Sequence, residues 1–224
     1  MRKVLFVAVH PDDETLGAGG TILKHKDAGD QIFWLVVTAP TKNHPCGFSD
    51  AFIEKRDKLV DESASAYGFD GTYKLNLPTQ MLHSVDIRYF VSLVDDVINQ
   101  VEPDTIYMMF KNDVHSDHRV SFDAVYSCTK SFRKAFIHRI YMIEALSETE
   151  FAPAIPSFTF TPNVYVDISP YIDRKLEIMA LYDKELMLEP YPRSLGSIRA
   201  LARVRGTRAG VMYAEAFQLL YERL

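Results

Sequence analysis

The chain has 224 residues and a mass of 25.6 kDa, which predicts one large domain spanning residues 1–224. Its apolar fraction of 47% and charged fraction of 25% are typical of a globular protein and exclude disordered, collagen-like and disulfide-scaffold classes. The 25 basic and 30 acidic side chains give a net charge of −5, which offers no basic field for a nucleic-acid partner.

Strands and helices alternate along the first two thirds of the chain. A buried strand over 3–9 precedes a helix over 15–28 that ends at Gly29, and a second buried strand spans 31–38. The same spacing rules predict a helix over about 52–67, a strand over 73–77, a helix over 85–101, a strand over 105–110, a helix near 117–133 and a strand near 139–145. This alternation predicts an α/β three-layer, Rossmann-like sandwich with a mostly parallel sheet.

The pattern changes after residue 147, where prolines become frequent. A strand over 164–168 and a helix from Ser169-Pro170 to about 186 are the elements that this stretch predicts. We interpret residues 147–224 as a C-terminal elaboration of the same domain.

No targeting segment is expected. The apolar run over 4–9 is too short for a signal peptide, and no stretch reaches the about 18 apolar residues of a membrane helix. Cys46 and Cys128 lack CxxC spacing, which indicates reduced thiols. We expect a cytoplasmic protein without a membrane span, and homo-oligomer formation stays open.

Two clusters of polar residues follow strands. His10-Pro11-Asp12-Asp13-Glu14 comes directly after the first strand, and Asp113-Val114-His115-Ser116-Asp117-His118 follows the strand over 105–110. In the common strand order 3-2-1-4-5, strands one and four are neighbours at the switch point, where ligands bind. We therefore expect the two clusters to meet.

Together the clusters offer two histidines and a carboxylate, a ligand set that leaves positions open for water and substrate. The set suits Zn²⁺ or Fe²⁺, and such a metal lowers the pKa of water toward about 7, which favours hydrolysis. The alternative is that Asp12 or Asp13 simply caps the following helix.

These motifs, with Tyr213-Ala214-Glu215-Ala216-Phe217, resemble the PIG-L/LmbE-like metal-dependent N-deacetylases over nearly the whole chain. The resemblance implies zinc ligands at His10, Asp13 and His118. It implies Asp12 as the general base.

The same resemblance implies that His115 stabilises the tetrahedral intermediate and protonates the leaving amine, and that Asp117 tunes this histidine. Arg56 stands where the family often has a site arginine, but Leu59 and the Pro78-Thr79-Gln80 stretch depart from the family pattern. The implied reaction removes an N-acyl group, usually acetyl, from an amino sugar, as in members that serve bacterial surface-glycan synthesis.

Two further sets of residues are candidates for substrate binding. His44 follows the second strand, and five arginines lie in a segment without acidic residues between Glu189 and Glu215. These are Arg193, Arg199, Arg203, Arg205 and Arg208. Arginine suits phosphate, so we hypothesise that Arg193 and Arg205 hold a phosphate or nucleotide on the sugar. Surface exposure, or pairing with distant carboxylates, is the alternative.

Two other functions stay open. The metal could serve hydrolysis of a non-sugar amide, or the pocket could bind a metal or sugar nucleotide without catalysis.

Overall fold

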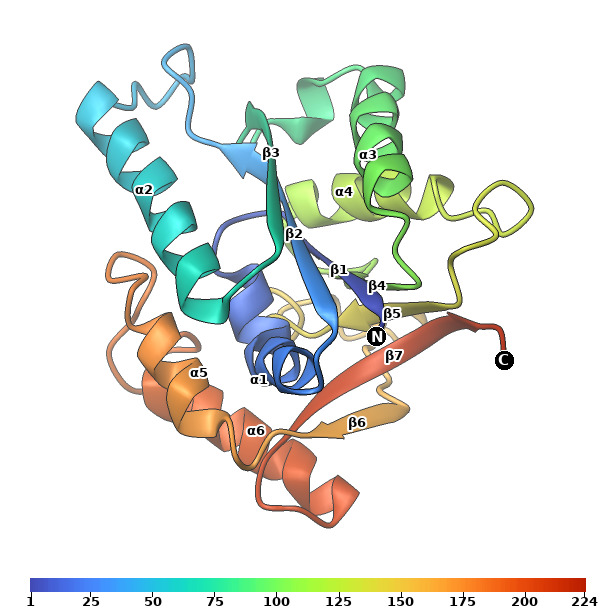
Figure 1. Ribbon diagram of the computed structural model, residues 1–224. Coiled ribbons are helices and arrows are strands. Elements are labelled where there is room, and N and C mark those ends of the chain that lie inside the picture. Colours follow the sequence, from blue (N-terminus) through green and yellow to red (C-terminus); the bar gives the residue numbers. More distant parts are fainter.

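All seven strands belong to one sheet, in the order β3-β2-β1-β4-β5-β7-β6 (Figure 1). The computed structural model describes residues 1–224. The strands are β1 (Lys3–Ala8), β2 (Gln31–Ala39), β3 (Gly71–Pro78), β4 (Thr105–Met109), β5 (Arg139–Ile143), β6 (Val164–Asp167) and β7 (Ala214–Glu222). The first five are parallel, and β7 runs antiparallel to both β5 and β6. The predicted α/β fold with a mostly parallel sheet is confirmed.

Helices cover both faces of the sheet (Figure 1). One face carries α1 (Asp13–Asp27), α2 (Asp50–Tyr67), α5 (Ile172–Met179) and α6 (Leu195–Ala209), and the other carries α3 (Ile87–Val101) and α4 (Ser116–Ser127). Short 3₁₀ turns lie at Leu82–Ser84 and Pro156–Phe158. This distribution follows from right-handed crossovers between parallel strands.

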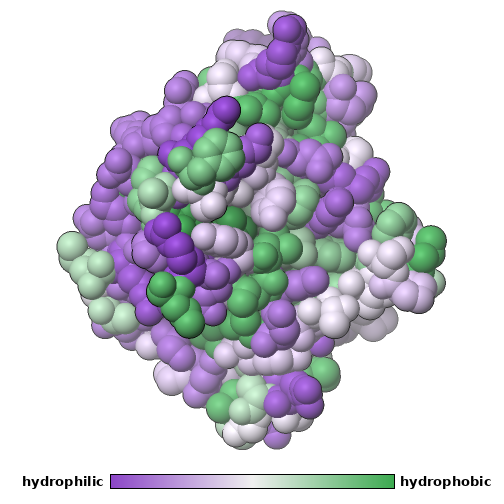
Figure 2. Space-filling view, turned by 90° about the vertical axis from the view of Figure 1, so that its right-hand side faces the viewer, coloured by the Kyte–Doolittle hydropathy of each residue, from purple (hydrophilic) through white to green (hydrophobic).

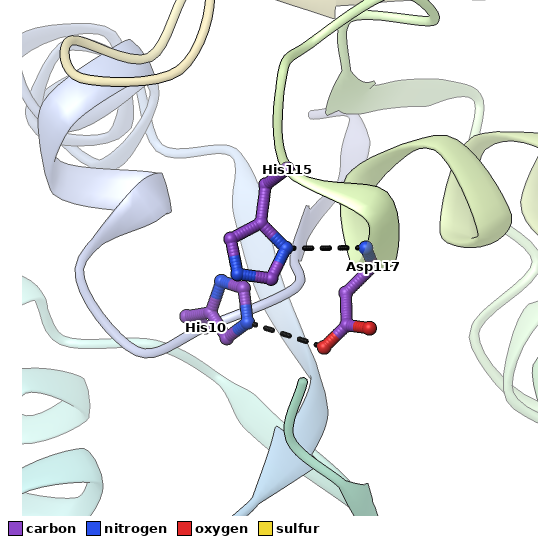
Figure 3. A group of neighbouring side chains, drawn as sticks. All are labelled: His10, His115 and Asp117. Atoms are coloured by element: carbon purple, nitrogen blue, oxygen red, sulfur yellow. Dashed lines mark hydrogen bonds and ion pairs between the residues drawn. The ribbon is translucent and has the colours of Figure 1, made fainter. Parts of the chain in front are cut away.

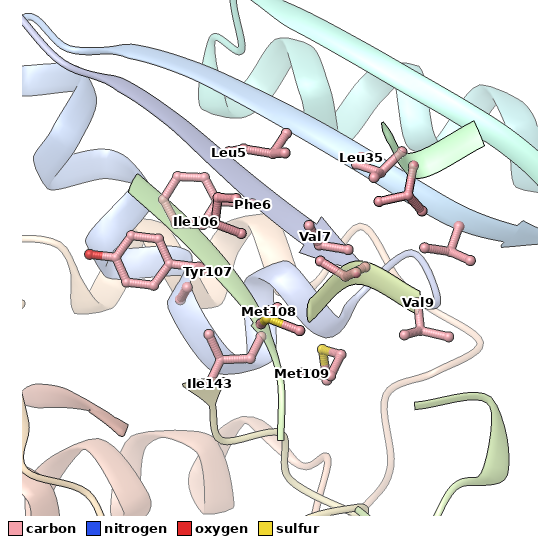
Figure 4. Close-up of a cluster of buried hydrophobic side chains, with 14 of the residues drawn as sticks. Leu5, Phe6, Val7, Val9, Leu35, Ile106, Tyr107, Met108, Met109 and Ile143 are labelled. Carbon is pink, nitrogen blue, oxygen red and sulfur yellow. The ribbon is translucent and has the colours of Figure 1, made fainter. Parts of the chain in front are cut away.

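The core lies on both sides of the central strands. Residues 4–9 are each at most 2% exposed, as expected for a strand covered on two faces. Side chains of β1, β2, β4 and β5 meet there, among them Leu5, Leu35, Met108 and Ile143 (Figure 4). Burial of each such side chain contributes about 1.5–3 kcal/mol.

β1 and β4 lie side by side, with Val4 paired to Thr105 and Phe6 to Tyr107. The chain leaves β1 toward β2 on one side, and the strands after β4 continue on the other. The expected strand order is therefore confirmed, and the turns after β1 and β4 flank the switch point.

The C-terminal part differs most from the predicted elements. The helix expected from Ser169 to about 186 is only α5, which ends at Met179, and the chain then turns so that Tyr182 is fully buried. α6 and β7 follow as separate elements, and β7 inserts between β5 and β6. The helix expected near 117–133 also ends earlier, at Ser127. Long-range burial, which periodicity does not contain, decides these boundaries.

A buried ion pair ties this C-terminal part to α1. Lys175 Nζ lies 2.7 Å from Glu215 Oε1, and the two side chains are only 3% and 4% exposed. Glu215 also accepts the backbone N–H groups of Gly20 and Thr21, and Lys175 donates to the carbonyl of Leu16. The pair therefore joins α5, β7 and α1 at one point.

No helix is long and apolar enough to cross a membrane. On the face shown in Figure 2, hydrophilic residues surround smaller hydrophobic areas.

Replacing Lys175 by Met should lower the free energy of unfolding by about 3–5 kcal/mol, because the Glu215 charge would stay buried without its cation. Urea unfolding measures the change. Lys58→Met is the matched control, because its partner Glu62 is exposed and the pair should contribute less than about 1 kcal/mol. Equal losses of stability in the two variants would mean that the buried Lys175–Glu215 pair stabilises the fold no more than an exposed ion pair does.

Candidate active site

A cavity of about 360 Å³ opens at the carboxyl ends of the central strands. Its walls come from the β1–α1 turn, the end of β2, the start of α2, and loops of the C-terminal part. The lining includes His10, Pro11, Asp12, Asp13, Thr38, Phe48, Phe52, Arg56, Gln80, His115, Glu148, Glu185 and Arg193. The two polar clusters therefore meet, as the strand order predicts.

Donor atoms of His10, Asp13 and His118 converge at the cavity, where His10 and Asp13 are part of the lining, and together they form one potential metal-binding group. His10 Nδ1 lies 3.3 Å from His118 Nε2 and 3.8 Å from Asp13 Oδ2, and His118 Nε2 lies 3.4 Å from Asp13 Oδ2. Ligand atoms about 2.0–2.1 Å from a tetrahedral zinc are about 3.3–3.4 Å apart. The spacing and chemistry of this donor set therefore fit a tetrahedral divalent metal with one position open.

Outer carboxylates orient both histidines of this group. His118 Nδ1 lies 2.9 Å from Asp113 Oδ2, and Asp113 also accepts the hydroxyl of Thr149 at 2.7 Å. His10 turns its Nε2 toward Asp117 Oδ2 at 3.5 Å (Figure 3). Metal-binding histidines usually make such a contact through the second ring nitrogen.

Asp113 is fully buried, and spacing alone does not single it out. Its place in the second polar cluster is the one sequence feature that points to it.

His10, His115 and Asp117 form a second group of potential metal ligands. In this group, however, His115 Nδ1 accepts the backbone N–H of Asp117 (Figure 3). The Asp117 carboxylate accepts the backbone N–H groups of Gln80 and Leu82. The Nδ1 atom of His115 and the Asp117 carboxylate therefore already accept backbone hydrogen bonds. The neutral His115 ring consequently carries its proton on Nε2. Asp117 thus approaches His10 through its carboxylate and His115 only through its backbone.

Asp12 lies beside the donor group and is 3% exposed. Burial, reinforced by the carboxylates of Asp13 and Glu185, raises the pKa of Asp12 well above its usual range, against the opposite effect of Arg56 and Arg193. Burial also acts to raise the pKa of Asp13, but His118 and His10 outweigh it and hold this pKa well below its usual range. The two adjacent carboxyl groups therefore differ in their affinity for a proton, as an acid–base residue beside a ligand requires.

The backbone of Asp12 is strained, with φ of 140° and ψ of −27°. Asp12 occupies the N-cap position of α1, but its side chain makes no cap hydrogen bond to the helix. The Asp12 N–H donates to Glu14 Oε2 at 3.1 Å, and the Asp12 carbonyl accepts from Leu16 N–H at 2.8 Å. Such a conformation persists only where surrounding contacts hold it.

Glu14 links the strained turn to the C-terminal part. Its Oε1 accepts the hydroxyl groups of Tyr182 and Thr15, both at 2.6 Å, and Tyr67 donates to Thr15 at 2.9 Å. Burial raises the pKa of Glu14 to about 7. Glu14 belongs to the first cluster in the sequence, but nothing in the sequence pairs it with Tyr182.

The predicted substrate-binding residues divide into two pairs. Arg56 and Arg193 line the cavity, and both contact Glu185, at 2.9 and 3.2 Å. Arg193 Nη1 also lies 3.6 Å from Asp12 Oδ2.

His44 and Arg205 do not line the cavity. His44 is buried between the Thr79 carbonyl and the Cys46 N–H, and Arg205 pairs with Glu144. The arginine-rich segment therefore does not converge on one site, because Arg193, Arg199 and Arg205 pair with different carboxylates, those of Glu185, Asp173 and Glu144.

The fold and the site define an α/β protein with a pocket suited to a divalent metal. A profile described as PIG-L: GlcNAc-PI de-N-acetylase matches residues 5–129, more than half of the chain. The chain belongs to this family, which confirms the resemblance seen in its motifs.

Relatives match over most of the chain. The diacetylchitobiose deacetylase of Thermococcus kodakarensis is 25% identical, over 98% of this chain and 84% of its own length. A protein of Bacillus cereus, named as a probable N-acetyl-alpha-D-glucosaminyl L-malate deacetylase, is 26% identical over 84% of this chain and 86% of its own. The crystal structure of the conserved protein TT1542 from Thermus thermophilus has the same fold, with a TM-score of 0.76 and 24% identity, over 100% of this chain and 97% of its own.

At about pH 8, where Glu14 with its pKa of about 7 is mostly ionised, replacing Tyr182 by Phe should lower the free energy of unfolding by about 1.5–3 kcal/mol, because the charged Glu14 carboxylate loses a buried hydrogen bond. Denaturant unfolding measures the loss. Tyr126→Phe is the control, since Tyr126 is 42% exposed and should change stability by less than about 0.5 kcal/mol. If Tyr182→Phe left the free energy of unfolding unchanged, the contact between Tyr182 and Glu14 would not stabilise the turn.

Proposed function

We propose that the protein is a metal-dependent hydrolase that removes an N-acetyl group from an amino sugar. The observation that carries the proposal is the position of Asp12, which lines the pocket beside the converging atoms of His10, Asp13 and His118. Two relatives that match most of the chain carry names of sugar deacetylases, which supports this reaction class.

We propose that His10, Asp13 and His118 hold zinc, with Fe²⁺ as the alternative ion for the same ligand set. When bound, a Lewis-acidic metal polarises the amide carbonyl and lowers the pKa of water. The two outer carboxylates, Asp113 and Asp117, would keep one nitrogen of each histidine directed at the ion.

The remaining groups would handle the proton and the developing charge. Asp12 has a raised pKa and accepts a proton from the attacking water as general base. Arg193, which contacts Asp12, keeps its carboxylate oriented toward the pocket. His115 would present its Nε2–H as a hydrogen-bond donor to the oxyanion of the tetrahedral intermediate, while the Asp117 N–H fixes its ring. The proton that Asp12 takes from the water would then pass to the leaving amine.

A phosphate or nucleotide on the sugar is not part of the proposal. The two arginines at the pocket, Arg56 and Arg193, are already paired with Glu185, and Arg205 is paired elsewhere with Glu144.

Zinc titration of protein stripped with a chelator tests the ligand assignment. Asp113→Asn should weaken zinc binding about 10–100-fold, as loss of an outer partner does, and Asp13→Asn should weaken it further. His115→Gln should keep one zinc per chain. If His115→Gln lost the metal and Asp13→Asn kept it, the ion would belong to the group of His10, His115 and Asp117 instead.

Turnover tests the reaction. Zinc-loaded wild type should release acetate from N-acetylated sugars, and Asp12→Asn should lower kcat by about 10²–10⁴-fold with zinc retained, because the general base is lost. Asp96→Asn, an exposed substitution on the opposite face of the sheet, should leave kcat unchanged.

If acetate were released only from non-sugar N-acetyl compounds, the substrate would be a non-sugar amide instead of an amino sugar. Sugar binding without acetate release, by fully metal-loaded wild type, would favour a binding protein.

A further inference from the structure

A second cavity, of about 570 Å³, lies beside the catalytic pocket between α2 and strands β2 and β3. We call it the α2 groove. In Figure 1, α2 lies along the β3 edge of the sheet, and only its second half carries buried side chains, from Leu59 onward. The first half of the helix therefore leaves space above the strands.

The α2 groove and the catalytic pocket share part of their walls. The residues common to both linings are Pro11, Thr38, Ala39, Pro40 and Arg56. Arg56 and Phe52 are four residues apart on α2 and face the pocket, whereas Ile53 and Asp57 line the groove. The groove therefore adjoins the pocket at Arg56, whose Nη2 donates to the Pro11 carbonyl at 3.2 Å.

A β-bulge shapes the floor of this groove. Val36 pairs with Lys74 and Thr38 with Leu77, so the single residue Val37 faces two residues of β3. One of these two is Asn76, which has a φ of 53°. Bulges often redirect a side chain near a binding site. Asn76 is exposed and lines the groove.

The lining suits a neutral polyhydroxylated ligand. Val36, Ile53 and Val60 supply apolar surface. Three basic and three acidic side chains line the groove, and their formal charges cancel. The basic residues are Lys42, Arg56 and Lys74, and the acidic residues are Asp50, Glu54 and Asp57. Lys42 pairs with Asp50 at 2.9 Å and Lys74 with Asp57 at 2.7 Å. No net positive field is left for a phosphate, whereas a sugar ring has an apolar face and hydroxyl groups that match this surface.

We propose that the α2 groove binds the saccharide unit attached to the N-acetylated sugar, with the Asn76 carboxamide hydrogen-bonding its hydroxyl groups. The proposal rests on the proposed deacetylase function and adds the substrate class: a neutral oligosaccharide rather than a monosaccharide or a phosphate-linked sugar. A carboxamide both donates and accepts hydrogen bonds, so the Asn76 side chain can bind a hydroxyl group that acts as acceptor or as donor.

The test compares kcat/KM of the zinc-loaded enzyme for N,N′-diacetylchitobiose, N-acetylglucosamine and a phosphate ester of N-acetylglucosamine. Wild type should prefer the disaccharide to both others. In Asn76→Gly the ratio of disaccharide to monosaccharide kcat/KM should fall about fivefold to tenfold, as expected for a lost hydrogen bond. Glycine adopts the positive φ of this position without strain, so the variant removes the amide and keeps the backbone.

Glu102→Gly is the matched control, because Glu102 is exposed, has a φ of 50° and lies at the end of α3 on the other face of the sheet. It should leave the substrate ratio unchanged. Glu54→Trp, at an exposed position of α2, should fill the groove and abolish the preference for the disaccharide.

Equal kcat/KM for disaccharide and monosaccharide in wild type would overturn the groove proposal and leave the deacetylase intact. A preference that survives both Asn76→Gly and Glu54→Trp, or a higher kcat/KM for the phosphate ester, would overturn it as well. Absence of acetate release from all three sugars would instead count against the proposed function.

Discussion

Three consecutive acidic residues are buried at the turn between β1 and α1, and the rest of the site is arranged around this constraint. Asp12 and Asp13 are 3% exposed and Glu14 is 1% exposed. A buried carboxylate is costly unless it is paired or hydrogen-bonded. Each of the three therefore needs its own partners within a few ångströms of its neighbours, and the chain supplies them from distant segments.

The three carboxyl groups receive different environments. Asp13 faces two histidine rings, Asp12 faces Arg193 across the pocket, and Glu14 points away toward Tyr182. Asp13 and Glu14 lie in the first turn of α1, where neighbouring side chains point about 100° apart, and Asp12 precedes the helix with its own strained backbone. The contact between Glu14 and the Asp12 N–H helps to hold the strained conformation.

The C-terminal part is therefore integral to the site as well as to the sheet. Tyr182, Glu185 and Arg193 lie between α5 and α6 and contact the acidic turn or the arginines of the pocket. The Lys175–Glu215 pair holds this part against α1, which begins at the same turn. The packing of the C-terminal part and the geometry of the turn between β1 and α1 are thus coupled through α1.

The alternation of strands and helices, the strand order at the switch point and the meeting of the two polar clusters could all be predicted from the amino-acid sequence. Those features depend on local periodicity and on topological rules, which a single sequence contains. Three-dimensional packing was needed to show that Asp113 orients His118, that Tyr182 partners Glu14, and that His44 and Arg205 lie away from the pocket. The end of α5 and the insertion of β7 between β5 and β6 were also set by packing. These outcomes depend on which long-range partner satisfies each buried polar group, and spacing along the chain does not encode that choice.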